Sequence, residues 1–144
     1  MEYRSKKTLA YCIPLCADGL LLKKNKWGIG EGRWTGFSAK ISENEKASDA
    51  AKRVVEETTG IKLFEMTALG KLIFEFEGDP ELLETFIYSG KALNKYCTQS
   101  KEIVPQWFEF SSLPLGEMWP DAMYWLPLAI KKQQFEGFFY FKDT

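Results

Sequence analysis

Three charged residues between positions 39 and 61 have the types and spacing that could do chemistry: Glu45, Arg53 and Glu57. Carboxylate oxygens are hard ligands of the kind that Mg²⁺ binds together with water and phosphate oxygens. Chemistry assisted by a metal ion is therefore what they suggest. The element that must position them is a helix, because residues 45–58 are rich in Ala, Lys and Glu and lack Gly and Pro. We predict a turn at residues 42–44 before this helix and a C-terminal cap at Gly60 after it.

One face of the predicted helix carries little charge. Side chains three or four residues apart share a face, so Val54, Glu57 and Thr58 lie together and Glu57 is the charged residue among them. Glu56 lies about 160° around the helix from Val54, so it cannot supply a carboxylate to this face. The simpler alternative is an amphipathic surface helix whose charges are only solvated.

The composition favours one globular domain, which we expect to span residues 1–144. The 19 positive and 20 negative side chains nearly balance, so no nucleic-acid partner is expected. No apolar run approaches the roughly 18 residues of a membrane helix, and the N-terminus lacks a signal-peptide core. We therefore expect no membrane partner and a cytoplasmic location.

The residue types also limit the chemistry. The sequence contains no histidine, and its three cysteines form no C-x-x-C pair, which excludes a Ser-His-Asp triad and a zinc site built from Cys and His. It contains neither a P-loop nor a G-x-G-x-x-G motif. Any reaction must rest on carboxylates, lysines and a metal ion.

Strands are predicted on both sides of the helix. Before it, residues 8–15 and 19–24 form two strands joined by an Asp18-Gly19 hairpin, and a Gly-rich loop at 27–33 follows. After it, apolar runs predict antiparallel strands at 62–77 and 84–93. A polar crossing at 100–104, a short strand at 107–110 and a final strand or aromatic tail at 137–142 follow. Residues 114–121 predict a loop with an exposed Trp119, and residues 122–134 a helix that Pro127 starts or kinks. This pattern predicts an α+β fold, or an α/β/α sandwich around a mixed sheet.

The spacing A-x5-E-x7-R-V-V-E-E-T-x-G-I, from Ala39 to Ile61, resembles the Nudix box G-x5-E-x7-R-E-U-x-E-E-x-G-U, where U is a bulky apolar residue. Four specific positions match: Glu45, Arg53, Glu57 and Gly60. Three positions depart from the pattern, with Ala39 in place of Gly and with Val54 and Thr58 in place of Glu. The resemblance implies a Nudix-type α/β/α sandwich and a loop-helix-loop that holds magnesium against a diphosphate.

Further segments are similar to MutT-like members of the Nudix family that hydrolyse oxidised purine nucleoside triphosphates. They are GRWTGF, FEFEGDPEL, Trp107-Phe108 and MWPD with Tyr124-Trp125. The resemblance implies a base pocket lined by Thr35, Phe74, Trp119 and Asp121, with Ile29 and Leu83 as apolar walls. Thr35 stands where these relatives have Asn, and Ala122 where they have a second Asp, so base selectivity should differ. Phe74 and Trp119 could instead be core aromatics.

The resemblance also implies metal and phosphate ligands. Glu57 would be the principal ligand of Mg²⁺ or Mn²⁺, with Glu102 as an auxiliary ligand or base and the carbonyl oxygens of Ser38 and Ala39 as further ligands. Arg53 and Glu45 would pair with each other or orient the loop and helix. On charge alone, Lys40 and Arg33 are candidates for phosphate contact.

These observations predict a Mg²⁺-dependent nucleoside triphosphate pyrophosphohydrolase that acts on purine nucleotides, including oxidised ones. Water activated by the metal would attack a phosphorus atom and release a monophosphate and pyrophosphate. One alternative is a nucleotide-binding protein of the same fold that has lost most or all hydrolysis, because Val54 and Thr58 replace carboxylates. A second is an aromatic-rich interaction module without a nucleotide. In the leading hypothesis the chain also acts as a monomer, with a nucleotide as its partner.

Overall fold

The computed structural model describes residues 5–28, 31–98 and 102–142. Ile29, which we expected as an apolar wall of the base pocket, lies outside these residues. Neither helix in the described ranges has the length and apolar character needed to cross a membrane.

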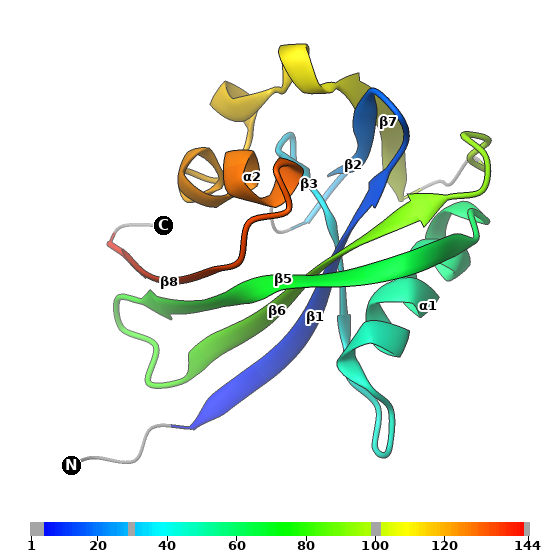
Figure 1. Cartoon of the computed structure of the whole chain (residues 1–144). Helices are drawn as coiled ribbons and strands as arrows, with labels where there is room; N and C mark the ends of the chain where they lie inside the picture. Colours follow the sequence, from blue (N-terminus) through cyan, green and yellow to red (C-terminus); the bar gives the residue numbers. More distant parts are fainter. Residues whose placement is uncertain (1–4, 29–30, 99–101, 143–144) are drawn as a thin grey trace.

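The described strands form one mixed sheet, drawn in Figure 1. Its strand order is β3-β2-β1-β6-β5-β8, while β4 pairs with β1 and β7 with β2. The β1–β6 and β5–β8 pairs are parallel and the other pairs antiparallel. The strands are β1 (Lys6–Leu15), β2 (Gly19–Asn25), β3 (Trp34–Thr35), β4 (Phe37–Lys40), β5 (Leu63–Phe76), β6 (Leu82–Ala92), β7 (Ile103–Glu109) and β8 (Phe135–Phe141).

The predicted hairpin and the β5–β6 pair are confirmed. At the hairpin, the Cys16 amide donates to the Gly19 carbonyl at 2.9 Å, and Leu15 faces Leu20 across the strands. The prediction for the segment before Trp107 was wrong, because β7 begins at Ile103. Ile103 is buried and faces Asn25 of β2, so the sheet extends into the segment that looked like a polar crossing.

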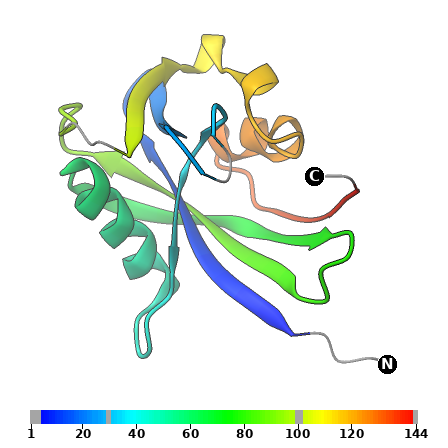
Figure 2. The ribbon, with the colours of Figure 1, turned by 180° about the vertical axis from the view of Figure 1, so that it is seen from behind.

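Helix α1 (Ala47–Thr59) covers one face of the sheet, as Figures 1 and 2 show. Its buried residues Ala50, Ala51 and Val55 pack in a cluster with β1 and β4. The predicted turn is present, with the Glu45 amide bonded to the Ser42 carbonyl, and it delays the helix to Ala47. Gly60 caps the helix in the left-handed region at φ 79°, as predicted.

Helix α2 (Ala122–Ile130) lies on the opposite face of the sheet (Figures 1 and 2). Trp125, Leu126 and Ala129 are buried there in a second apolar cluster. Two short 3-10 turns, Phe110–Ser112 and Leu115–Glu117, lead into this helix. The prediction that it continues to residue 134 was wrong, because Lys132 takes a positive φ of 57° and turns the chain into β8. The predicted α/β/α arrangement is confirmed.

We predict that Leu126→Ala lowers the free energy of unfolding by about 2–5 kcal/mol, because Leu126 is fully buried between α2 and the sheet. Urea unfolding measures the change. Met123→Ala is the matched control on the same helix: Met123 is 58% exposed, so its loss should change stability by no more than about 0.5 kcal/mol. Equal losses in the two variants would contradict the placement of α2.

Candidate functional site

A cavity of about 320 Å³ lies on the α2 side of the sheet. Its wall is largely apolar, with Leu9, Leu72 and Ile87 from the sheet and Met118 from the segment before α2. Pockets for small organic molecules commonly enclose about 300–1,000 Å³ and combine apolar walls with a few polar groups. The cavity therefore has the size and character of a site for a small, mostly apolar group such as a nucleobase.

The structure brings together the described members of the predicted base pocket. Thr35 comes from β3, Phe74 from β5 and Leu83 from β6, and Phe74 and Leu83 face each other across the two strands. Trp119 and Asp121 come from the segment that enters α2. These five side chains converge on one cavity although they are spread over much of the chain.

Trp119 is held from two sides. Its ring meets that of Phe141 edge to face, with centroids 6.1 Å apart. The Arg33 guanidinium lies 4.6 Å from the Trp119 ring centroid and donates to the Met118 carbonyl at 3.2 Å. The prediction that Trp119 is exposed was therefore wrong, since the side chain is half-buried by these contacts.

Asp121 is a buried carboxyl group at the start of α2, with only 6% of its surface exposed. It does not cap the helix, because its Oδ2 accepts a hydrogen bond from Trp125 Nε1 at 2.8 Å. Burial raises the pKa of Asp121 above its ordinary value. The group can accept a hydrogen bond from a ligand and, once protonated, can also donate one.

Phe74 belongs to an aromatic wall as well as to the cavity. Its ring stacks against those of Phe76, Phe139 and Phe141, with centroids 5.9 to 6.4 Å apart. Both readings of Phe74 from the sequence therefore describe it, because the same ring packs in the core and lines the cavity.

Several lining residues were missed by sequence reasoning, among them Tyr11, Lys23, Asn25 and Trp125. Tyr11 could have been found from the two-residue period of β1, where it shares a face with Ile13. Lys23 is partly buried, which lowers the pKa of its amine, and it lies 5.9 Å from the Phe37 ring centroid. Trp125 belongs to the Tyr124-Trp125 segment that resembles the family, although no role in the pocket was expected for it.

Ser38 links the cavity to the Nudix-like segment. Its side chain lines the cavity, and it lies in β4, which leads directly into the turn before α1. The Lys40 side chain is exposed at the end of the same strand and does not line the cavity. β4 therefore connects the cavity to the loop before α1.

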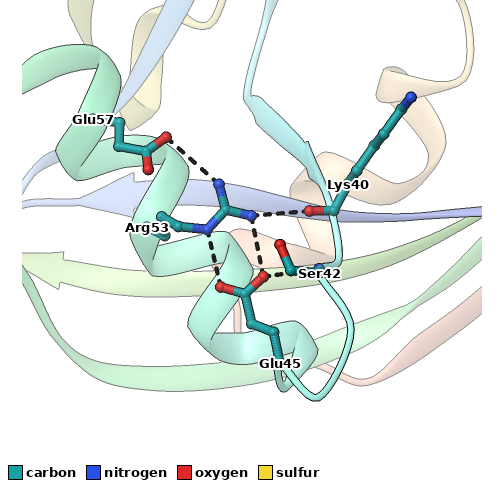
Figure 3. A network of polar contacts seen from close by, with 5 residues as sticks. All are labelled: Lys40, Ser42, Glu45, Arg53 and Glu57. Atoms are coloured by element: carbon teal, nitrogen blue, oxygen red, sulfur yellow. Dashed lines mark hydrogen bonds and ion pairs between the residues drawn. The ribbon is translucent and has the colours of Figure 1, made fainter.

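A hydrogen-bonded network joins this loop to α1 (Figure 3). Arg53 donates two bonds to the Glu45 carboxylate, Nε to Oε2 at 2.9 Å and Nη2 to Oε1 at 3.1 Å. Arg53 Nη2 also donates to the Lys40 carbonyl at 2.9 Å, and the Ser42 amide donates to Glu45 at 3.0 Å. These bonds lower the pKa of Glu45 to about 2, with those from Arg53 as the largest cause. Arg53 and Glu45 are thus paired, the arrangement that the resemblance implied.

The donor set for a metal ion is sparse. Glu57 is 62% exposed, and its Oε2 lies 3.5 Å from Arg53 Nη1. Val54 packs against the apolar cluster beneath α1. Within residues 5–28, 31–98 and 102–142 no group of three or more His, Cys, Asp or Glu side chains could hold a metal ion. Glu102 lies exposed just before β7 and is not part of such a group.

These residues fit a magnesium ion only in part. Mg²⁺ commonly uses one or two carboxylates and takes its other ligands from water and substrate phosphates. Glu57 and nearby backbone carbonyls could complete such a shell once a phosphate is present. They do not form a closed site made from protein alone.

The Glu45 network predicts a pH-dependent contribution to stability. The pKa of Glu45 is depressed from 4.5 to about 2 in the folded protein, so the contribution is present above about pH 4.5 and is lost as the pH falls toward 2. The difference in unfolding free energy between the wild type and Glu45→Gln should thus be larger at pH 7 than at pH 3 in urea unfolding. Glu43→Gln, in the same exposed loop, is the control, and a pH-independent difference for Glu45→Gln would contradict the network.

Comparison with known proteins gives relatives along most of the chain, although no protein-family model matches. The chain is 40% identical over 124 residues to the oxidized purine nucleoside triphosphate hydrolase of Mus musculus, covering 86% of this chain and 80% of the mouse protein. It is 32% identical over 138 residues to the Danio rerio protein of the same name, covering 96% and 88%.

Solved structures share the fold. The mMutator MutT protein of Bacillus halodurans superimposes with a TM-score of 0.76 at 19% identity, over 94% of this chain and 90% of that one. A Nudix hydrolase from Nitrosomonas europaea gives 0.70 at 17% identity, over 97% and 82%. The family predicted from the sequence is therefore confirmed: the chain belongs to the MutT-like Nudix hydrolases, in the family of the oxidized purine nucleoside triphosphate hydrolases.

Proposed function

We propose that the chain is a Mg²⁺-dependent, or Mn²⁺-dependent, nucleoside triphosphate pyrophosphohydrolase that acts on purine nucleotides, including oxidised ones. It would cleave the triphosphate into a nucleoside monophosphate and pyrophosphate. The observation that carries the proposal is that Ser38 lines the cavity and also lies in the strand that leads into the Glu45–Arg53 loop. The names of the mouse and Danio rerio relatives support the same substrate class.

The cavity is assigned to the base. Phe74, Leu83 and Trp119 supply apolar and aromatic surface, and stacking of a base on an aromatic side chain stabilises nucleic-acid complexes by about 1–3 kcal/mol. Thr35 and Asp121 supply the polar groups that read its edge. The triphosphate would then extend past Ser38 toward α1.

The phosphate side is assigned to the loop and helix. Arg53 and Glu45 hold the end of β4 against α1, the helix that carries Glu57. Glu57, Glu102 and the carbonyl oxygens of Ser38 and Ala39 in β4 are the proposed metal ligands, and the ion, when bound, would neutralise phosphate charge and polarise the phosphoryl group.

Two further roles complete the assignment. Instead of binding the metal, the Glu102 carboxylate would take the proton from the attacking water. Lys40, exposed at the end of β4, stays a proposed phosphate contact on its charge.

Val54 and Thr58 are proposed to weaken metal binding without removing the reaction. The identity to proteins named as hydrolases does not favour either alternative, the inactive nucleotide-binding protein or the interaction module. The expected cytoplasmic location, the single domain and the monomeric state stay predictions.

The function is tested with a panel of purine nucleoside triphosphates, scored for released pyrophosphate in the presence of Mg²⁺ or Mn²⁺. The wild type should release pyrophosphate, and Glu57→Gln should lower kcat/KM by about 10- to 100-fold or more, since even the groups behind metal ligands contribute on that scale. Glu56→Gln is the matched control, because it removes the same charge from the neighbouring exposed residue. No release from any purine nucleotide, or equal losses in the two variants, would refute the assignment.

Restoring the family pattern provides a second prediction. Val54→Glu with Thr58→Glu should raise the affinity for Mg²⁺, because both side chains share the helical face of Glu57. The variant should also be less stable without metal, since like charges at these spacings repel by about 0.2–0.5 kcal/mol and the change at Val54 removes its contact with the apolar cluster. Calorimetric titration with Mg²⁺ measures the affinity. The uncharged pair Val54→Gln with Thr58→Gln is the control, and a folded Glu variant with unchanged affinity would contradict the metal site.

A further inference from the structure

Tyr11 has a role in the cavity that the reaction described above does not use. It lies in β1, on the face that packs against α2, and its side chain lines the cavity together with Thr35 and Asp121. A phenol hydroxyl in an apolar wall is costly unless it is hydrogen-bonded. The partners of this hydroxyl therefore explain its presence.

The Tyr11 hydroxyl has two partners, and in the contact with Thr35 either oxygen could donate. The Gly36 amide donates to Tyr11 Oη at 2.6 Å, and a backbone N–H can only donate, so the Tyr11 oxygen is the acceptor in this bond. Thr35 Oγ1 lies 3.3 Å from the same oxygen. Burial raises the pKa of Tyr11 to about 12, so the hydroxyl keeps its proton at neutral pH, and Thr35 Oγ1 is an acceptor within its reach.

The direction in which the Thr35 hydroxyl points depends on which hydroxyl donates in this contact. A threonine hydroxyl has one proton and two acceptor positions. If Thr35 Oγ1 accepts the Tyr11 proton, its own proton is released to point elsewhere. Because Thr35 lines the cavity, that proton is available to a ligand there.

We propose that Tyr11 is a positioning residue that holds Thr35 as a hydrogen-bond donor toward the base, so that the cavity selects purines with a carbonyl oxygen over those with an amino group at that edge. The proposal rests on the assignment of the cavity to the base. It adds a selectivity rule to that assignment and gives the purine edge a chemical class, the lactam, in which a carbonyl lies beside a ring N–H.

The surroundings of Tyr11 fix its ring and connect it to the second polar group. A side-chain carbon added to Gly36 would lie only 2.6 Å from the Tyr11 ring, so the ring packs directly on the glycine backbone. On its other side the ring meets Trp125 edge to face, with centroids 5.6 Å apart. Trp125 in turn donates to Asp121. One packed unit thus holds a donor, Thr35, and a carboxyl acceptor, Asp121, and this pair matches a lactam edge.

The test measures binding of deoxyinosine and deoxyadenosine 5′-monophosphates by calorimetry without metal. The two nucleotides share sugar and phosphate and differ in carrying a lactam or an amino group on the base. The wild type should bind the inosine nucleotide more tightly, and Tyr11→Phe should reduce that preference by about 5-fold or more, the scale of one buried hydrogen bond.

A double-mutant comparison separates positioning from pocket shape. Thr35→Val should reduce the preference as Tyr11→Phe does, and adding Tyr11→Phe to it should have no further effect. Thr35→Ser should retain the preference, because it keeps the hydroxyl. Tyr140→Phe is the control for loss of a tyrosine hydroxyl, since Tyr140 is 52% exposed on β8.

Each outcome is decisive. Independent, additive effects of the Tyr11 and Thr35 changes would overturn the proposal. A preference that survives Thr35→Val would overturn it too. The Thr35→Val measurement still tests the proposal if Tyr11→Phe fails to fold. A wild type that binds neither nucleotide, or both equally, would overturn it as well. Because no turnover is measured, absence of hydrolysis in the pyrophosphate assay would refute the proposed reaction while leaving this rule standing.

Discussion

The paired hydrogen bonds from Arg53 to Glu45 are the interaction on which the rest of the site depends. A guanidinium bound through two nitrogens to one carboxylate fixes direction as well as distance. The same guanidinium holds the Lys40 carbonyl, so the last residue of β4 cannot move independently of α1. Since Ser38 of β4 lines the cavity, one interaction sets the position of the proposed phosphate site relative to the proposed base site.

The cavity itself results from the way the sheet divides. β1 and β2 pair only at Leu15 and Leu20. Earlier in β1, from Leu9 to Cys12, the strand on the same edge is β4 instead of β2. β2 instead continues with β3, where Lys23 faces Thr35. Tyr11, Lys23, Thr35 and Ser38 all lie where these strands diverge, and all line the cavity. The cavity therefore lies beside the place where these strands separate.

Local signals predicted much of this fold. The Asp18-Gly19 hairpin, the turn before α1 and the cap at Gly60 depend on a few adjacent residues, so the sequence contains what is needed to predict them. The start of β7 and the end of α2 depend on tertiary contacts. Ile103 joins the sheet because Asn25 faces it, and the backbone reverses at Lys132 to bring β8 alongside β5.

In the site, too, features set by adjacent residues were predicted and features set by tertiary contacts were not. The resemblance to the Nudix box drew attention to Glu45 and Arg53, whose pairing needs only one loop and one helix. Tyr11 was missed because its role depends on Gly36 and Thr35, 25 and 24 residues away along the chain. Asp121 lines the cavity as expected, but its bond to Trp125 and its buried state come from packing that no short pattern encodes.

In the proposed site one ligand spans both faces of the sheet, with its base in the cavity and its phosphate beside α1. A crystal structure of the chain with a bound purine nucleoside monophosphate tests this arrangement. We expect ring atoms within about 4 Å of Trp119 and Asp121, with the phosphate directed past Ser38 toward Glu57. A base bound outside the cavity, or a phosphate directed away from β4, would contradict it.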